Sequence, residues 1–175
     1  RVSQDLGIKY NSPTEGLYFN SQDYYEFLSR LDFYLNEAKL AFVEHSRFPE
    51  GDALRDKWEH WFPIGLLDGR VEVLFMHYKT EEEAAEKWYK RAKRVNFDDL
   101  IVVGVEHAWA REQDIADFDT LPFKKKLYFT TRDYGYQSSV FVKEFEGWEA
   151  VGDPYHYTRI LYKYFVDFFR HCKWI

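Results

Sequence analysis

The sequence predicts an α/β fold: three α/β/α layers around a mainly parallel, Rossmann-like sheet, with an antiparallel edge strand as an option. Two observations support this prediction. Short apolar segments alternate with amphipathic helical segments through short connections, which is typical of right-handed crossovers on a parallel sheet. The length of 175 residues is close to the usual size of one domain. We therefore expect a single α/β domain over residues 1–175.

The first expected element is a helix. Apolar side chains recur at helical spacing over residues 23–38, directly after the capping residues Asn20 and Ser21. A short strand is expected at residues 40–46. Residues 47–63 predict an irregular connection with one helical turn.

A turn, a strand and a helix follow. Asp68–Gly69 predicts a turn, and residues 71–76 carry too many apolar side chains for a strand with one exposed face. The clearest helix in the chain is expected at residues 81–94. It opens with a capping box in which Thr80 caps the helix and Glu83 reaches back.

The second half of the chain continues the alternation. Five elements are expected there: a buried strand at 100–105, a short helix at 112–121, a strand at 125–131, a further strand at 138–145 that can form an edge, and a last helix at 157–169. The apolar face of the last helix is expected to serve packing.

Composition excludes several classes of protein. The single cysteine, Cys172, rules out an internal disulfide framework and fits a reducing compartment, so we expect a cytoplasmic location. The apolar runs are far shorter than the roughly 20 residues that a membrane span needs, and no signal peptide is visible. The net charge of −6, from 24 basic and 30 acidic residues, disfavours nonspecific nucleic-acid binding.

The motifs of common cofactors are missing from the sequence. It has neither G-x-G-x-x-G nor a Walker loop, and the three glutamates that open the helix at residues 81–94 would repel a pyrophosphate. The six histidines lack the tight spacing of metal ligands. No G-x-S-x-G elbow is present. We therefore expect neither a cofactor nor a metal.

Polar residues follow three of the predicted strands. They lie at residues 77–80, 106–107 and 130–133, where a parallel sheet presents its ligand-binding edge. A histidine, a carboxylate and several hydroxyls at one edge can supply a general base, an orienting acid and hydrogen bonds to a substrate. The alternative is structural, because strand ends are commonly polar where they reach water.

The basic end of the helix at residues 81–94 is better explained by helix stability than by phosphate binding. Its glutamates lie at the start and its cations at the end, as the helix dipole favours, and several pairs of opposite charge are three or four residues apart. Arg91 flanks the apolar stripe that includes Trp88. We expect Arg91 to be partly buried and paired with a carboxylate.

Three segments of the sequence carry a resemblance to known proteins: LGIKYNSPT at residues 6–14, FPIGLLDGRVEVLFMHYKTEEEAAEKWYKRAKRVN at residues 62–96, and FDTLPFKKKLYFTT at residues 118–131. The central segment is the most specific, with the pair His77–Tyr78 followed by Trp88, Arg91 and Arg94 at characteristic spacing. The chain resembles the bacterial exopolysaccharide biosynthesis proteins, whose domain has no settled function. Members of this family usually carry an additional amino-terminal strand.

The resemblance implies an α/β fold and a role in capsule or exopolysaccharide synthesis, and it leaves two functions open. The first is a glycosyltransferase-like enzyme that acts on a sugar or nucleotide sugar, with His77 or Glu106 as the catalytic base. Hydroxyl and charged side chains would then position the substrate: Ser12, Thr14, Tyr78, Thr80, Thr130 and Arg132. Trp88, Arg91 and Arg94 are assigned structural or anion-pairing roles.

The second function is a noncatalytic glycan-binding or regulatory subunit of a polysaccharide synthase. Tryptophans in or near loops could then stack on sugar rings; these are Trp58, Trp61, Trp109 and Trp148. Core packing or a contact in a homo-oligomer is the alternative use of each ring.

Overall fold

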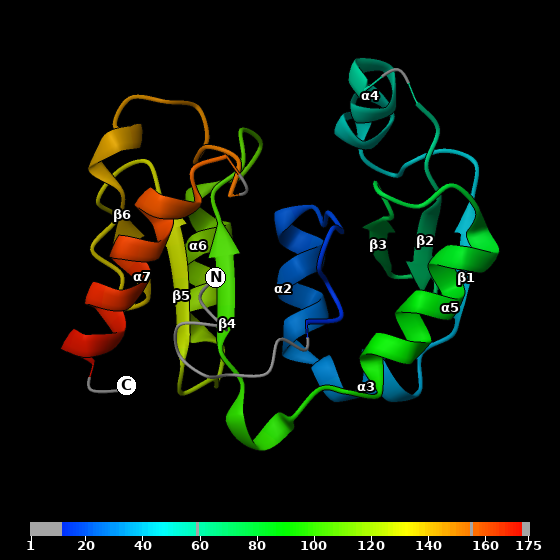
Figure 1. The fold of residues 1–175 in the computed structure, drawn as a ribbon, viewed down its shortest axis with the longest axis horizontal. Coiled ribbons are helices and arrows are strands. Elements are labelled where there is room, and N and C mark those ends of the chain that lie inside the picture. The colour runs from blue at the N-terminus through cyan, green and yellow to red at the C-terminus, as the bar shows by residue number, and fades with distance from the viewer. Residues whose placement is uncertain (1–11, 59, 155, 173–175) are drawn as a thin grey trace. The chain divides into compact units, whose positions relative to one another are not determined.

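The computed structural model describes residues 12–58, 60–154 and 156–172 (Figure 1). Backbone contacts divide the chain into two compact units, and each has its own three-stranded sheet. The first unit consists of Tyr10–Phe97, and the second contains Asp98–Ile175. The first sheet is antiparallel and the second is parallel. The expectation of one mainly parallel, Rossmann-like sheet is therefore wrong, although the mixed α/β class is confirmed.

The antiparallel sheet has the strand order β1-β2-β3. Its strands are β1 (Leu40–Val43), β2 (Ile64–Leu67) and β3 (Val71–Leu74). The predicted turn at Asp68 and Gly69 joins β2 to β3, and both residues have a positive φ, of 52° and 67°. This conformation is typical of the tight turns that connect antiparallel neighbours. The short turn explains why β3 pairs with β2 and does not enter a parallel sheet.

The described part of the first unit contains four α-helices: α2 (Ser21–Ser29), α3 (Leu31–Asn36), α4 (Pro49–Trp58) and α5 (Glu81–Ala92). The expected helix over residues 23–38 is broken at Arg30, whose φ of −130° and ψ of 40° are not helical. Helix α4 is longer than the single turn expected in its region. The predicted cap of α5 is confirmed, because the Thr80 side chain accepts a hydrogen bond from the Glu83 N–H.

Aromatic side chains form the centre of the first unit. Trp88 of α5 is 1% exposed, and its ring centroid lies 6.0 Å from that of Phe27 and 6.4 Å from that of Phe75. Phe27 and Phe75 come from α2 and from the end of β3, so the three rings join helices to the sheet. Burial of large aromatic rings in this way provides much of the stability of a small core.

The parallel sheet has the order β4-β5-β6. The elements of this second unit are β4 (Val102–Val105), α6 (Glu112–Thr120), β5 (Lys126–Thr130), β6 (Ser139–Phe141), the short 3₁₀ helix η2 (Lys143–Phe145) and α7 (Thr158–His171). A further 3₁₀ helix, η1 (Phe97–Asp99), spans the boundary between the two units in the sequence. Strand β6 lies at an edge, as expected, and pairs parallel to β5. Only residues 131–138 connect β5 to β6, without a crossover helix.

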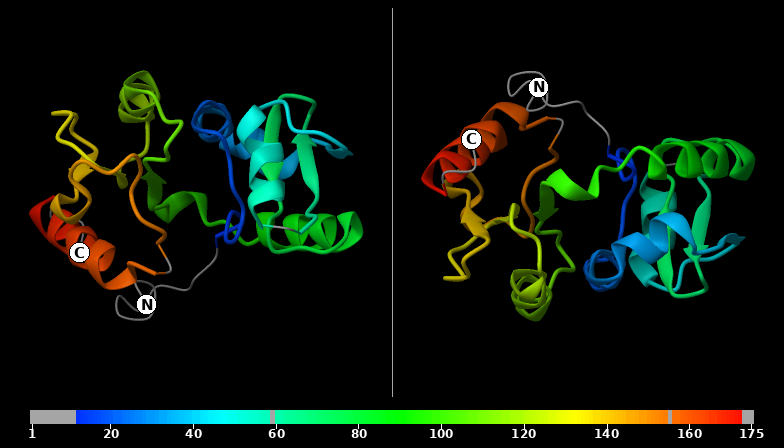
Figure 2. Two further views of the ribbon diagram at one scale, coloured as in Figure 1. Left: turned by 90° about the horizontal axis from the view of Figure 1, so that it is seen from above. Right: turned by 90° about the horizontal axis from the view of Figure 1, so that it is seen from below.

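Helices α6 and α7 lie on opposite faces of the parallel sheet (Figure 2). Side chains of a strand alternate between faces, and β5 shows both contacts. Leu127 and Phe129 belong to the apolar cluster that includes Phe165 of α7. Tyr128 packs against Phe118 of α6, with ring centroids 4.9 Å apart. This unit therefore has the three-layer arrangement that was expected for the whole chain.

In the part of the chain that the structure describes, no helix has the length and apolar character needed to span a membrane.

Candidate functional site

The predicted site residues fall into two groups, one in each unit. His77, Tyr78 and Thr80 follow β3 in the antiparallel sheet, whereas Glu106 and Thr130 belong to the parallel sheet. The premise that all three strand ends share one edge of one parallel sheet is therefore wrong for β3. Each group thus belongs to its own unit, and the roles assigned to individual residues stay predictions.

Glu106 is the central polar residue at the carboxyl edge of the parallel sheet. Its side chain is almost fully buried, at 3% exposure. Carboxylate oxygen Oε2 accepts hydrogen bonds from the Thr131 N–H at 2.6 Å and the Thr131 hydroxyl at 3.0 Å. The other oxygen, Oε1, accepts one from the Tyr134 hydroxyl at 2.6 Å. Glu106 thus fastens the segment after β5 to the end of β4. For Glu106 to act as a base, the Tyr134 hydroxyl must first be displaced from the carboxylate.

Burial and the hydrogen bond to Glu106 raise the pKa of Tyr134 well above its ordinary value of 10.0. Tyr134 therefore stays protonated and donates to the carboxylate. Thr130, fully buried, donates from its hydroxyl to the Arg132 carbonyl at 2.8 Å. The Arg132 guanidinium lies 5.2 Å from the centroid of the Tyr134 ring. These contacts give the predicted residues Thr130 and Arg132 local structural partners.

His107 follows Glu106 at the same edge. Burial lowers the pKa of His107 from 6.5 to about 4, because the charged imidazolium loses hydration. The imidazole is therefore neutral at physiological pH. A neutral imidazole can accept or donate a proton in a hydrogen bond but adds no positive charge to this edge.

Two half-exposed tryptophans lie in the loops at this edge. Trp109 follows β4 and is 48% exposed, and Trp148 follows β6 and is 49% exposed. The Val151 N–H donates a hydrogen bond of 2.9 Å to the Glu106 carbonyl, which ties the loop of Trp148 to the end of β4. Trp61, in the other unit, is similarly exposed at 52%. The side chain of Trp58 lies outside the described part of the chain.

The group in the first unit surrounds the end of β3. His77 is exposed, and the loop at Gly16 packs closely on it, since a Cβ at Gly16 would lie 2.8 Å from His77 Cδ2. Gly16 has a φ of 69°, which favours glycine. The Thr14 N–H donates to the Ser12 hydroxyl at 3.2 Å, and the two hydroxyls are 3.0 Å apart. The structure thus brings Ser12, Thr14 and His77 into one region of this unit.

Tyr78 and Arg91 lie beside this loop. Tyr78 is buried, at 8% exposure, and desolvation raises its pKa while the charge of Arg91 opposes the increase. Arg91 is half-buried, as expected, but its guanidinium donates to the Glu15 carbonyl at 2.9 Å in place of the expected carboxylate. Arg94 is exposed at the end of α5. The contacts of Tyr78 and Arg91 hold the Glu15–Gly16 loop against α5.

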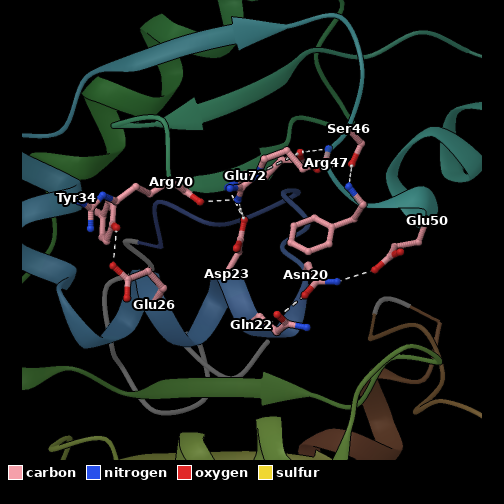
Figure 3. A network of polar contacts seen from close by, with 11 residues as sticks. Asn20, Gln22, Asp23, Glu26, Tyr34, Ser46, Arg47, Glu50, Arg70 and Glu72 are labelled. Carbon is pink, nitrogen blue, oxygen red and sulfur yellow. Dashed lines mark hydrogen bonds and ion pairs between the residues drawn. The ribbon is translucent and has the colours of Figure 1, made fainter.

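Sequence reasoning missed a network of buried charges in the first unit (Figure 3). Asp23 of α2 is 8% exposed and Glu72 of β3 is 3% exposed. Asp23 Oδ2 accepts hydrogen bonds from the Glu72 N–H at 2.6 Å and from the Arg47 guanidinium at 2.5 Å. Glu72 Oε2 accepts one from the Arg47 N–H at 2.7 Å, and Glu72 Oε1 accepts one from the Ser46 hydroxyl. The Arg47 guanidinium also donates to the Arg70 carbonyl.

Desolvation raises the pKa values of both Asp23 and Glu72, and the hydrogen bonds and the charge of Arg47 reduce the increase. Perturbed carboxyl groups are often functional, but they also occur in structural ion-pair networks. Here the contacts join α2, the segment at residues 46–47, and β3 together with Arg70 before it. One signal could have revealed the site: Glu72 is a lone charge in an otherwise apolar strand, where a buried partner is required.

Within the described ranges, no group of three or more His, Cys, Asp or Glu side chains is arranged to hold a metal ion.

Comparison with known proteins identifies a family. Residues 1–175 match the family described as a domain of unknown function, DUF1919. The chain belongs to this family. It is also 35% identical, over 174 residues, to an uncharacterized protein of Haemophilus influenzae, and the match covers 99% of this chain and 77% of that protein. Neither description names a substrate, reaction or partner.

Proposed function

We propose that the protein is a noncatalytic carbohydrate-binding subunit of extracellular polysaccharide synthesis. The carbohydrate binds to the loops at the carboxyl edge of β4, β5 and β6. The observation that carries this proposal is the pair of half-exposed rings, Trp109 and Trp148, in loops joined through Glu106 and Val151. Carbohydrates present apolar C–H faces that stack on such rings, while tryptophan N–H groups remain available for hydrogen bonds.

The engagement of Glu106 favours binding over catalysis. Three donors occupy its carboxylate oxygens, so the most buried acid at this edge holds the loops in place. A rigid edge lowers the entropy lost when a ligand binds. The connection with polysaccharide synthesis comes from the sequence resemblance, and the single cysteine, which fits a reducing compartment, supports a cytoplasmic location for this function.

A sugar-transfer enzyme is the second candidate, because of the position of Glu106. The carboxyl edge of a parallel sheet is where ligands bind in open α/β folds, and a carboxylate there can act as a base once a substrate displaces Tyr134. His77 belongs to the other unit, and its role as a base stays a separate prediction.

A thermal-shift and binding screen tests the proposal with oligosaccharides and nucleotide sugars. A ligand at 100 times its dissociation constant adds about 2.7 kcal/mol to the free energy of unfolding. We expect oligosaccharides to raise the midpoint, and Trp109→Ala and Trp148→Ala to remove the shift. Trp61→Ala, at an equally exposed ring in the other unit, is the matched control and should retain it. Stabilisation by nucleotide sugars with turnover lost in Glu106→Gln would favour the enzyme. Absence of any shift would refute both candidates.

A further inference from the structure

The ring of Trp148 is held in place before any ligand binds. Its centroid lies 5.1 Å from that of Phe145 and 5.9 Å from that of Tyr157, and these two rings lie 5.1 Å apart. Phe145 is 1% exposed and anchors the group in the core of the second unit. The three residues form a rigid aromatic platform, in which about half of the Trp148 side chain is exposed to solvent.

The backbone around this aromatic platform is also constrained. A Cβ at Gly152 would lie 2.4 Å from the Tyr157 ring and 2.8 Å from Phe145, so the chain approaches the rings more closely than other residues allow. Gly147, next to Trp148, has a φ of 79°, in the region that favours glycine. The Trp148 N–H donates to the Phe145 carbonyl at 3.0 Å. A loop fixed in this way can present a ring without ordering it during binding.

The charges around the aromatic platform are negative. Residues 144–157 contain four acidic side chains, neither lysine nor arginine, and one histidine, His156, whose ring centroid lies 4.7 Å from that of Tyr157. Glu146, Glu149 and Asp153 are exposed, whereas Glu144 accepts a hydrogen bond from the Tyr164 hydroxyl at 2.8 Å. Ligands with carboxylate or phosphate groups would be repelled by these side chains, and cations would be attracted.

Cationic side chains flank this acidic segment: Arg159 follows it at the start of α7, and the Tyr164 hydrogen bond, helped by the charges of Lys163 and Lys143, lowers the pKa of Glu144. Arg111, after Trp109, is paired with Asp114, with Nη2 2.5 Å from Oδ1. Arg132 is exposed beside the acidic Asp133. Lys143 precedes the acidic segment and lies next to Glu144. His107 is neutral because burial lowers its pKa.

Resting on the proposed function, we infer that the ligand is a polymer of amino sugars with free ammonium groups, as in a deacetylated hexosamine chain. The pyranose ring stacks on Trp148, and its ammonium group is attracted both by the negative face of the indole and by the carboxylates of Glu146 and Glu149. Neutral sugars still stack on the indole ring but lack the attraction to the carboxylates. Uronic-acid polymers lose both specificity and affinity because their charge has the wrong sign.

Isothermal titration of the full chain with four β-1,4-linked tetramers tests this inference. The tetramers contain glucosamine, N-acetylglucosamine, glucose or glucuronate and are compared at pH 6 and low salt. We expect the glucosamine tetramer to bind at least about tenfold more tightly than the glucose tetramer, which corresponds to about 1.4 kcal/mol. The preference should fall at high salt, because exposed charges are screened.

Variants separate stacking from charge. The double variant Glu146→Gln, Glu149→Gln should lose the preference for glucosamine and retain binding of glucose, whereas Trp148→Ala should lose both. Tetralysine carries charge without a sugar ring and should bind at least tenfold more weakly than the glucosamine tetramer. Equally tight binding of tetralysine would overturn the inference as nonspecific charge attraction.

The outcomes distinguish the inference from the proposed function. Equal affinity for the glucose and glucosamine tetramers, lost in Trp148→Ala, would overturn the amino-sugar inference and leave carbohydrate binding intact. Preference for glucuronate would also overturn it. No binding of any tetramer, and no stabilisation by other oligosaccharides, would refute carbohydrate binding itself.

Discussion

Removal of the Glu72 carboxylate should destabilise the first unit much more than its replacement by an amide. In Glu72→Ala, the Arg47 N–H, now 2.7 Å from Oε2, and the Ser46 hydroxyl lose their common acceptor. In Glu72→Gln, the amide oxygen can accept from the Arg47 N–H. The amide NH₂ can donate to Ser46 Oγ, which already accepts from the Phe48 N–H at 3.0 Å.

The size of the loss follows from these contacts. A hydrogen bond to a charged group contributes about 1.5–3 kcal/mol, so the two together give an upper limit of about 3–6 kcal/mol. Water recovers part of this at the half-buried Ser46 and the exposed Arg47. Removal of the carboxylate also removes the desolvation cost that raises the pKa of Glu72. We expect the free energy of unfolding to fall by about 2–3 kcal/mol in Glu72→Ala and by less than about 1 kcal/mol in Glu72→Gln.

Urea denaturation, followed by tryptophan fluorescence, measures both free energies of unfolding. The ratio of the two effects is the informative result, because both variants remove the charge and only alanine removes the acceptor. Equal destabilisation by alanine and glutamine would refute the reasoning, since it would show that the ion pair with Arg47 is the dominant contribution. A loss below about 0.5 kcal/mol in Glu72→Ala would show that water replaces the network completely.

Three further predictions concern pH, packing and capping. The folded-state pKa values of Asp23 and Glu72 lie above the ordinary 3.8 and 4.5, so the stability that these groups contribute is complete below the ordinary values and is lost as pH rises through the raised pKa values. Glu72→Gln should make the free energy of unfolding, measured in urea between pH 3 and 7, fall less steeply with pH, and an unchanged pH dependence would contradict the raised pKa of Glu72. Gly104→Ala should cost about 2 kcal/mol or more, because its Cβ would lie 2.1 Å from the Tyr128 ring. Gly135→Ala is the comparison in thermal unfolding: its added Cβ meets no atom within 4 Å, so only the strain of alanine at a φ of 72° remains, and an equal fall of the two midpoints would contradict the packing argument. Thr80→Ala should cost about 1 kcal/mol in chemical denaturation through loss of the α5 cap, whereas Thr80→Ser should restore most of it, and failure of serine to do so would point to a packing role for the methyl group.

Local features of the chain were predictable because neighbouring residues determine them. The Asp68–Gly69 turn, the Thr80 cap and the order of strands and helices after residue 100 all follow from short-range patterns. The break at Arg30 was missed, since apolar side chains continue at helical spacing through it. The length of α4 was also missed because its sequence has no pronounced apolar stripe.

The candidate sites were predictable only where they depend on one strand and the loop after it. Glu106 and Thr130 were found in this way, but the hydrogen bonds that occupy Glu106 come from Thr131 and Tyr134, 25 and 28 residues away. The link between Trp148 and the end of β4 depends on the Val151 backbone. Such contacts arise from loop conformations that no periodic pattern specifies.

Apart from the break at Arg30 and the length of α4, the sequence by itself determined which segments of this chain form strands and helices and which of their faces are apolar. Only the tertiary structure decided that the strands of the first half form an antiparallel sheet separate from that of β4 and β5, because an apolar strand pattern reports burial and does not specify which sheet a strand joins. It also brought Asp23 to Arg47 and Glu72, which are 24 and 49 residues away. Buried charges need partners, and the partners come from wherever the packed chain places a complementary group.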